Sequence, residues 1–289
     1  MILAGKRLLI TGVITRDSIA FHAAEQAQKE GATVLLCARG PRELERTRDL
    51  LDQTAPGRVH AMVCNVALEA DVDRLAREAE LRLGGVDILV ANAAVYGPKG
   101  AIDEINWVKW VEAIQINLIG TVYCCRVFLP LLKRAQRGKI VILSGGGATK
   151  PLPFLSAYAA SKAGLVRFGE TLAEEVKEFG IDVNLVAPGA LNTRLLDEVL
   201  EAGPERVGEA FYNAALKQRD AGGTPLEYGA NLCVHHASGA SDGVSGRLIS
   251  AQWDPWLRIG ELKDELMGSD IYTLRRIVPN ERGKNWDRQ

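Results

Sequence analysis

Cysteine, metal-binding clusters and excess charge of one sign are all scarce in this sequence. Five cysteines occur among 289 residues, and neither they nor the four scattered histidines have the spacing of a metal site. The odd cysteine count argues against a disulfide framework and predicts a reducing compartment, with no bound metal. The 35 basic and 36 acidic side chains are interspersed and leave a net charge of -1. Because no basic patch is evident, we expect no nucleic acid and no anionic membrane as a partner.

Long apolar runs are also missing. Residues 1–10 place Lys6 and Arg7 before only a few apolar residues, unlike a signal peptide, and no later run approaches the length of a membrane span. These absences predict a cytoplasmic protein. Apolar residues nevertheless make up 47% of the chain, which is enough for the core of one large domain without metals or disulfides.

Short apolar segments alternate with longer segments of helical period. The predicted strands are Arg7–Ile10, Thr33–Cys37, Val59–Val63, Val86–Ala91, Lys139–Leu143, Asp182–Val186 and Arg247–Ser250. Alternation of this kind predicts parallel strands joined by right-handed crossovers. The expected fold class is therefore α/β, a single doubly wound Rossmann-type parallel sheet with helices on both faces. Ligands bind such sheets beyond the carboxyl ends of the strands.

The domain organisation follows from where the strand pattern ends. We predict one domain over residues 1–251, in which the segment 192–224, helical in composition and broken by glycines, covers the site. Residues 252–289 are charged and rich in tryptophan and carry no further strand pattern. We expect this extension to pack on the same domain or on a neighbouring subunit.

The turn after the first strand has the character of a phosphate site. Backbone amides at a tight turn and at a helix N-terminus favour an anion, and Gly12, Ser18 and Ile19 stand where such a turn meets a helix. Only Gly12 remains of the usual glycine trio, so an ordinary strand-to-helix connection capped by Ser18 is equally compatible with the turn alone. Arg39 ends the second strand where no acidic residue could hold a ribose 2′-hydroxyl, which favours NADP(H) over NAD(H). The alternative is that Arg39 is a solvated charge.

Tyr158 and Lys162 form the most informative pair in the chain. Residues four apart lie on one face of a helix. A free tyrosine titrates near pH 10, and a nearby ammonium can lower that pKa enough for proton transfer at neutrality. By itself the pair also fits a half-buried tyrosine beside a solvated lysine.

Several motifs, taken in order, resemble the short-chain dehydrogenase/reductase family over about residues 5–251. They are the opening strand, turn and helix, Asn92-Ala93-Ala94 after the fourth strand, Asn117, Ser144, Tyr158-x-x-x-Lys162 and Pro188-Gly189. The resemblance implies that Tyr158 is the proton donor or acceptor and that Lys162 lowers its pKa and holds the nicotinamide ribose. It further implies that Ser144 polarises the substrate oxygen and that Asn117 supports a water leading from Lys162 to solvent.

The same resemblance assigns cofactor contacts. Asn65 and Val66 would touch the adenine, and Asn92 and Ala93 would line the cofactor. Pro188, Gly189 and Thr193 would hold the carboxamide. Relatives commonly pair through the helices expected over about residues 104–135 and 155–179, which implies a homodimer or homotetramer.

Two departures from the family pattern stand out. The opening turn is similar to that of the enoyl-acyl carrier protein reductases, yet counting back from Lys162 by the longer spacing of that branch lands on Leu155. The family usually places its serine one residue closer to the tyrosine than Ser144, at the position of Gly145.

Three functions remain open at this stage. The leading hypothesis is an NADP(H)-dependent oxidoreductase that interconverts a secondary alcohol and a ketone of small-molecule size. The alternatives are an enoyl-thioester reductase and a catalytically silent NADP(H)-binding sensor or scaffold.

Overall fold

Seven short apolar segments form one parallel sheet in the order β3-β2-β1-β4-β5-β6-β7 in the computed structural model, which describes residues 1–286. The strands are β1 (Arg7–Thr11), β2 (Thr33–Ala38), β3 (Val59–Val63), β4 (Ile88–Ala91), β5 (Lys139–Leu143), β6 (Asp182–Ala187) and β7 (Arg247–Ser250). All seven predicted strands are present, and the predicted fold class is confirmed. The strand order reverses between β1 and β4, which is where a doubly wound sheet binds its ligand.

The start of β4 differs from the prediction by two residues. Val86 and Asp87 precede the strand, and the Asp87 carboxylate accepts hydrogen bonds from the backbone N–H and the guanidinium of Arg7, each at 2.8 Å. The Arg7 side chain holds the pKa of Asp87 below its usual range, against the opposing effect of burial. At this end of the sheet the side-chain pair adds to backbone pairing, since the Asp87 N–H donates to the Arg7 carbonyl at 2.9 Å and the Asp87 carbonyl accepts from the Lys139 N–H at 3.0 Å.

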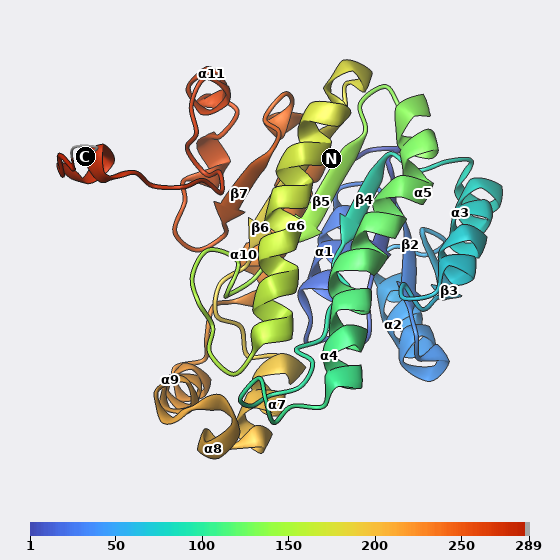
Figure 1. Ribbon diagram of the computed structural model, residues 1–289. Helices are drawn as coiled ribbons and strands as arrows, with labels where there is room; N and C mark the ends of the chain where they lie inside the picture. The colour runs from blue at the N-terminus through green and yellow to red at the C-terminus, as the bar shows by residue number, and fades with distance from the viewer. Residues whose placement is uncertain (287–289) are drawn as a thin grey trace.

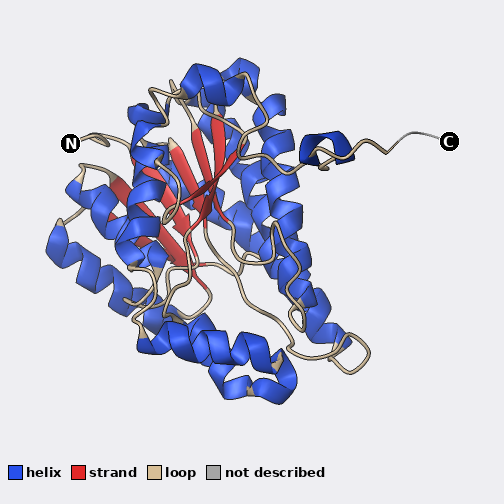
Figure 2. Cartoon of the chain, turned by 90° about the vertical axis from the view of Figure 1, so that its left-hand side faces the viewer, coloured by secondary structure: helices blue, strands red, loops and turns tan. Residues whose placement is uncertain are grey.

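Helices connect the strands and cover both faces of the sheet (Figure 2). They are α1 (Ile19–Lys29), α2 (Pro41–Thr54), α3 (Glu69–Leu83), α4 (Trp107–Ile114), α5 (Gly120–Arg134), α6 (Ser156–Glu175), α7 (Arg194–Ala202), α8 (Pro204–Val207), α9 (Glu209–Asp220), α10 (Leu226–Ala237) and α11 (Lys263–Met267). A π-helical turn, η1 (Gln115–Ile119), joins α4 to α5. Short 3-10 helices follow at η2 (Lys177–Phe179), η3 (Gly239–Ser241), η4 (Trp256–Arg258) and η5 (Pro279–Arg282).

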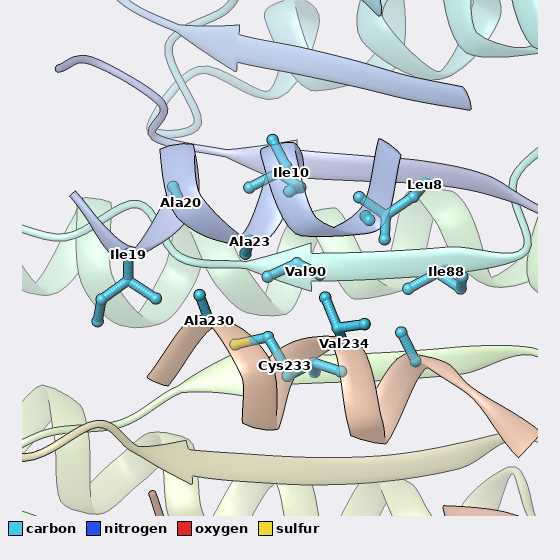
Figure 3. Packing of buried hydrophobic residues seen from close by; sticks show 14 of the residues in the cluster. Leu8, Ile10, Ile19, Ala20, Ala23, Ile88, Val90, Ala230, Cys233 and Val234 are labelled. Carbon is cyan, nitrogen blue, oxygen red and sulfur yellow. The ribbon is translucent and has the colours of Figure 1, made fainter. Parts of the chain in front are cut away.

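Two apolar clusters, one on each face, hold the layers together. On one face α1 and α10 lie side by side over β1 and β4, and small residues such as Ala23 and Ala230 allow their close approach (Figure 3). On the other face α3, α5 and α6 pack through residues such as Leu75, Phe128 and Leu165. Burial of these side chains is the main stabilising contribution to the sheet.

The helical stretch Trp107–Arg134 corrects one expectation from the sequence. It has 28 residues, and an 18-residue window within it has a mean hydropathy of 1.4, so it is long and apolar enough to cross a membrane by length and composition alone. Its buried residues, however, include Cys124, Phe128 and Leu132, which pack in the cluster shared with α3 and α6. In this structure the stretch is a helix of the protein core.

The cover and the C-terminal extension lie outside the layered body (Figure 1). The predicted cover, 192–224, contains α7, α8 and α9, with the chain breaking between helices at Gly203 and Gly208. The extension folds back on its own chain as far as Leu274, whose backbone N–H donates to Glu170 Oε1 of α6 at 2.5 Å. Beyond that residue it leads away from the body, and a contact with a neighbouring subunit remains a prediction; residues 287–289 lie outside the described part of the chain.

Candidate active site

One cavity of about 920 Å³ opens at the carboxyl ends of β1 and β4. Every site residue predicted from the sequence except Asn117 lines it. These are Gly12, Ser18, Ile19, Arg39, Asn65, Val66, Asn92, Ala93, Ser144, Tyr158, Lys162, Pro188, Gly189 and Thr193. Residues far apart in the chain therefore converge on a single site, as the doubly wound topology requires.

The first turn provides the amide-rich end of the cavity. Gly12 has φ +76°, and a Cβ there would lie 2.6 Å from Ala93 Cα, so only glycine fits where the two loops meet. Ser18 is the N-cap of α1: its Oγ accepts from the Phe21 N–H at 3.2 Å and donates to the Thr15 carbonyl at 2.7 Å. The positive end of the α1 dipole thus faces the cavity, which suits a bound phosphate.

Arg39 leaves the end of β2 on the rim of the same cavity. Its side chain is exposed and has no acidic partner among the described residues. Asp17 is the one acidic residue among those that line the cavity in the described chain. The combination of an available guanidinium, a helix N-terminus and few carboxylates fits a phosphorylated dinucleotide.

Thr11, which the sequence reasoning did not single out as a site residue, holds the loop after β4 in place. Its Oγ1 accepts from the backbone N–H groups of Asn92 at 3.0 Å and Ala93 at 3.1 Å. The Asn92 side chain in turn donates from Nδ2 to the Thr11 carbonyl at 2.9 Å. The predicted cofactor-lining pair is therefore fixed against β1 at the switch point.

Lys162 is buried behind Tyr158 on α6. Its Nζ donates to the Leu143 carbonyl at 2.6 Å and lies 5.6 Å from the centroid of the Tyr158 ring. Burial lowers the pKa of Lys162 to about 8. The ammonium is therefore held at the end of β5 and is poised to lose its proton not far above neutral pH.

Tyr158 is 7% exposed; its backbone carbonyl accepts from Ser161 Oγ at 2.7 Å, whereas its hydroxyl has no hydrogen-bond partner among the described residues. Burial raises the pKa of Tyr158 above its usual value, and the neighbouring Tyr96 adds to this effect. In this arrangement burial outweighs the lowering expected from Lys162, whose ammonium is turned toward a carbonyl. The phenol is consequently protonated at neutral pH and available as a proton donor.

The family pattern places its serine at position 145, which holds Gly145 here, and the neighbouring Ser144 was the candidate for that role. Ser144 belongs to the residues that line the cavity, but its Oγ is shielded from solvent and has no hydrogen-bond partner within residues 1–286. Gly145 lies against the phenol: a Cβ added there would be 2.2 Å from Tyr158 Oη. The Tyr158 hydroxyl thus takes the space that a side chain at position 145 would need.

Asn117 lies behind the cavity, fully buried within η1. Its Oδ1 accepts from the Val95 N–H at 2.8 Å, and its Nδ2 donates to the Val95 carbonyl at 2.8 Å and to Ser161 Oγ at 3.0 Å. The Thr121 hydroxyl donates to the Asn117 carbonyl at 2.9 Å. Asn117 therefore fixes the loop that follows Asn92, while the predicted water contact remains a prediction. A π-turn at such a residue is common near functional sites.

Tyr96 is a second site residue that sequence reasoning missed. It lies four residues after Asn92 and lines the cavity, with its ring centroid 4.6 Å from that of Tyr158 in an edge-to-face arrangement. Burial, followed by the charge of Glu198, raises its pKa to about 12. Its position two residues after the Asn92-Ala93-Ala94 motif was the available signal.

The far wall of the cavity comes from the cover and is largely apolar. The side chains there include Leu196, Val199, Phe211, Ala214 and Ala215. The polar residues of this wall are Thr193, Arg194 and Gln218. Two of them are already engaged, since Arg194 Nη1 pairs with Glu198 at 3.4 Å and Gln218 Nε2 donates to the Leu191 carbonyl at 2.9 Å.

Trp253, from the C-terminal extension, is 78% exposed and also lines the cavity. Its backbone N–H donates to Ser250 Oγ at 3.3 Å, which ties it to the end of β7. The extension therefore contributes a side chain to the site in addition to its packing on α6.

Comparison with known proteins places these features in context. The family model described as enoyl-(acyl carrier protein) reductase matches residues 12–252. Dehydrogenase/reductase SDR family member 4 of Bos taurus is 31% identical over 204 residues, covering 71% of this chain and 72% of that protein. Farnesol dehydrogenase of Aedes aegypti is 29% identical over 206 residues, covering 69% of this chain and 83% of that protein.

The chain is also similar to solved structures of reductases. A crystal structure of actinorhodin polyketide ketoreductase with NADPH has a TM-score of 0.76 and 26% identity, covering 85% of this chain and 95% of its own. Levodione reductase has a TM-score of 0.78, with 86% and 96% of the two chains covered; at 23% identity it supports the fold alone.

Proposed function

The chain belongs to the short-chain dehydrogenase/reductase family, and from that premise we propose that it is an NADP(H)-dependent oxidoreductase that interconverts a secondary alcohol and a ketone. The observation that carries the proposal is the Tyr158 phenol, which has no hydrogen-bond partner among the described residues, lies in the cavity and has the Lys162 ammonium 5.6 Å from its ring centroid.

In the proposed mechanism Tyr158 is the general acid and base. Reduction of a ketone requires a proton at the substrate oxygen, and a phenol that burial keeps protonated can donate it. Lys162 then stabilises the phenolate that remains, and in alcohol oxidation the phenolate takes the proton back. The nicotinamide coenzyme, when bound, supplies or accepts the hydride.

The preference for NADP(H) rests on Arg39. Its unpaired guanidinium at the end of β2 can hold a 2′-phosphate, and no acidic residue of the cavity stands at that strand end. The turn of Gly12 and Ser18 would hold the pyrophosphate, and Thr193 with Pro188 and Gly189 the carboxamide.

The substrate class follows from the cover. A wall of leucine, valine, phenylalanine and alanine side chains stabilises an apolar body and offers few hydrogen bonds to a sugar. We therefore propose an apolar alcohol or ketone, larger than acetone, with its oxygen at Tyr158.

The proposal is tested with Tyr158→Phe. The variant should bind NADPH with unchanged affinity by fluorescence titration and should lose reduction of trans-2-decalone, a bicyclic apolar ketone. Turnover that persists in Tyr158→Phe, or a wild-type protein that binds NADPH but never reduces the ketone, would overturn the proposed function.

An enoyl-thioester reductase is the second candidate, favoured by the description of the matching family model. Against it, the position where that branch carries its tyrosine holds Leu155, which is fully buried and has no proton to transfer. Incubation with crotonyl and acetoacetyl thioesters and NADPH separates the two, because a carbonyl reductase consumes only the second. Binding of NADPH without turnover of any alcohol or ketone would instead favour the silent sensor or scaffold.

Assembly and location complete the proposal. Trp107, Val108 and Val111 on α4 are exposed apolar side chains. We propose that this helix and α6 pair in a homodimer or homotetramer, as in relatives, and that the protein acts in the cytoplasm.

A further inference from the structure

The substrate oxygen needs a second hydrogen-bond donor that the usual position does not supply. Developing negative charge on a carbonyl oxygen is best stabilised by more than one donor aimed at it. Here Gly145 has no side chain, and a Cβ at that position would lie 2.2 Å from Tyr158 Oη. Ser144 keeps its Oγ away from the cavity surface.

The hydroxyl of Tyr96 is free to fill this role. It has no hydrogen-bond partner among the described residues and, unlike the Ser144 Oγ, is not among the side-chain oxygens shut off from solvent. Its ring lies edge to face with Tyr158, 4.6 Å between centroids, on the cavity side of the loop. Two phenols therefore border the same part of the cavity.

The surroundings of Tyr96 hold it in place. Asn117 clamps the adjacent Val95 through both its N–H and its carbonyl, each at 2.8 Å. Lys99 Nζ lies 5.6 Å from the Tyr96 ring centroid and pairs with Glu198 of the cover at 3.2 Å. The raised pKa of Tyr96 keeps its hydroxyl protonated over the working range of the enzyme.

We propose that Tyr96 is a catalytic residue, which donates a hydrogen bond to the substrate oxygen alongside Tyr158 and takes the place of the serine that position 145 lacks. This inference rests on the proposed function. In ketone reduction Tyr158 transfers its proton to the oxygen, whereas Tyr96 keeps its own proton and stabilises the charge that develops there.

Tyr96→Phe is the informative variant because it removes the hydroxyl and keeps the ring that lies edge to face with Tyr158. With trans-2-decalone and NADPH we expect kcat to fall about 100-fold, the typical loss for one such donor, with KM changed far less. Tyr212→Phe on α9 is the matched control: Tyr212 packs in the cover but does not line the cavity, and its variant should match the wild type.

The stretching frequency of the substrate carbonyl distinguishes a hydrogen-bond donor at Tyr96 from a side chain that only packs there. In a complex of the protein with NADP⁺ and carbonyl-¹³C trans-2-decalone, the carbonyl stretch should lie at lower wavenumber in the wild type than in Tyr96→Phe, since each hydrogen bond weakens the C=O bond. An unchanged stretch together with unchanged kcat in Tyr96→Phe would overturn the role of Tyr96. If Tyr158→Phe is inactive in the same assay, the proposed function would stand while this inference fails.

Discussion

The amide side chain of Asn117 forms two hydrogen bonds with the backbone of Val95, accepting from its N–H and donating to its carbonyl, each at 2.8 Å. These bonds connect the π-turn η1 to the loop that follows β4. The residues next in the chain include Tyr96, so the geometry of the active site depends on a buried side chain that does not itself line the cavity.

Asn117→Ala should therefore destabilise the protein and disorder this loop. It leaves a part-buried N–H and carbonyl without partners, which predicts a loss of about 2–4 kcal/mol in the free energy of unfolding. Urea denaturation measures the change. Asn213→Ala, at an exposed position on α9, is the control and should be neutral. Equal free energies of unfolding for the two variants would show that the hydrogen bonds between Asn117 and Val95 do not stabilise the protein.

The coenzyme preference can be tested at Arg39. A charge-assisted hydrogen bond contributes about 1.5–3 kcal/mol, so Arg39→Ala should weaken NADPH binding by about 10- to 100-fold and leave NADH binding nearly unchanged. Fluorescence titration with both coenzymes measures this ratio. Arg42→Ala provides the control, because Arg42 is exposed on α2 and does not line the cavity. A ratio unaltered in Arg39→Ala contradicts the phosphate assignment.

The strands could be predicted from sequence because each is a short apolar run between segments of helical period, and a parallel sheet buries both faces of such runs. The location of the cavity could also be predicted, because motifs that follow parallel strands must meet at the edge of the sheet where the strands end. The π-turn at Asn117 and the inward-turned Ser144 hydroxyl could not be predicted in this way. Both depend on side-chain contacts between segments distant in the chain, which no local pattern encodes.

The limits of prediction are clearest for the Tyr158 pKa. The i, i+4 spacing correctly places Lys162 on the same helix, but spacing says nothing of burial or of the Leu143 carbonyl that takes the ammonium. Tyr96 illustrates the converse, since a single tyrosine in a loop has no pattern until the fold sets it beside another.

Substrate size should depend on Ala214 in the cover. This residue lines the cavity yet is exposed, so a larger side chain can enter the cavity without disturbing the packing of the cover. Ala214→Phe should lower kcat/KM for trans-2-decalone by at least about tenfold and spare 2-butanone, given the usual cost of steric misfit in an apolar pocket. Asn213→Phe adds the same ring at an exposed neighbour that does not line the cavity and should have no effect. Unchanged activity toward both ketones in Ala214→Phe would place the substrate elsewhere.

The stability of the protein should depend on pH through Lys162. Burial lowers its pKa from 10.5 to about 8, so between these values the unfolded chain binds a proton that the folded protein has released. Stability then rises with pH across this window, whereas below about pH 8 the folded protein carries a buried charge that costs about 3 kcal/mol.

Lys162→Met removes that cost but leaves the Leu143 carbonyl unpaired, which predicts a net gain of about 1–2 kcal/mol at pH 7. The gain should shrink as the pH rises from 8 toward 10, because Lys162 is then neutral in the folded wild-type protein and the stability of the wild type rises. Urea denaturation at pH 7 and pH 9.5 measures the difference, with Lys217→Met, at an exposed position, as the control that should show neither effect. A difference between Lys162→Met and the wild type that is the same at both pH values would mean that Lys162 keeps its ordinary pKa in the folded protein.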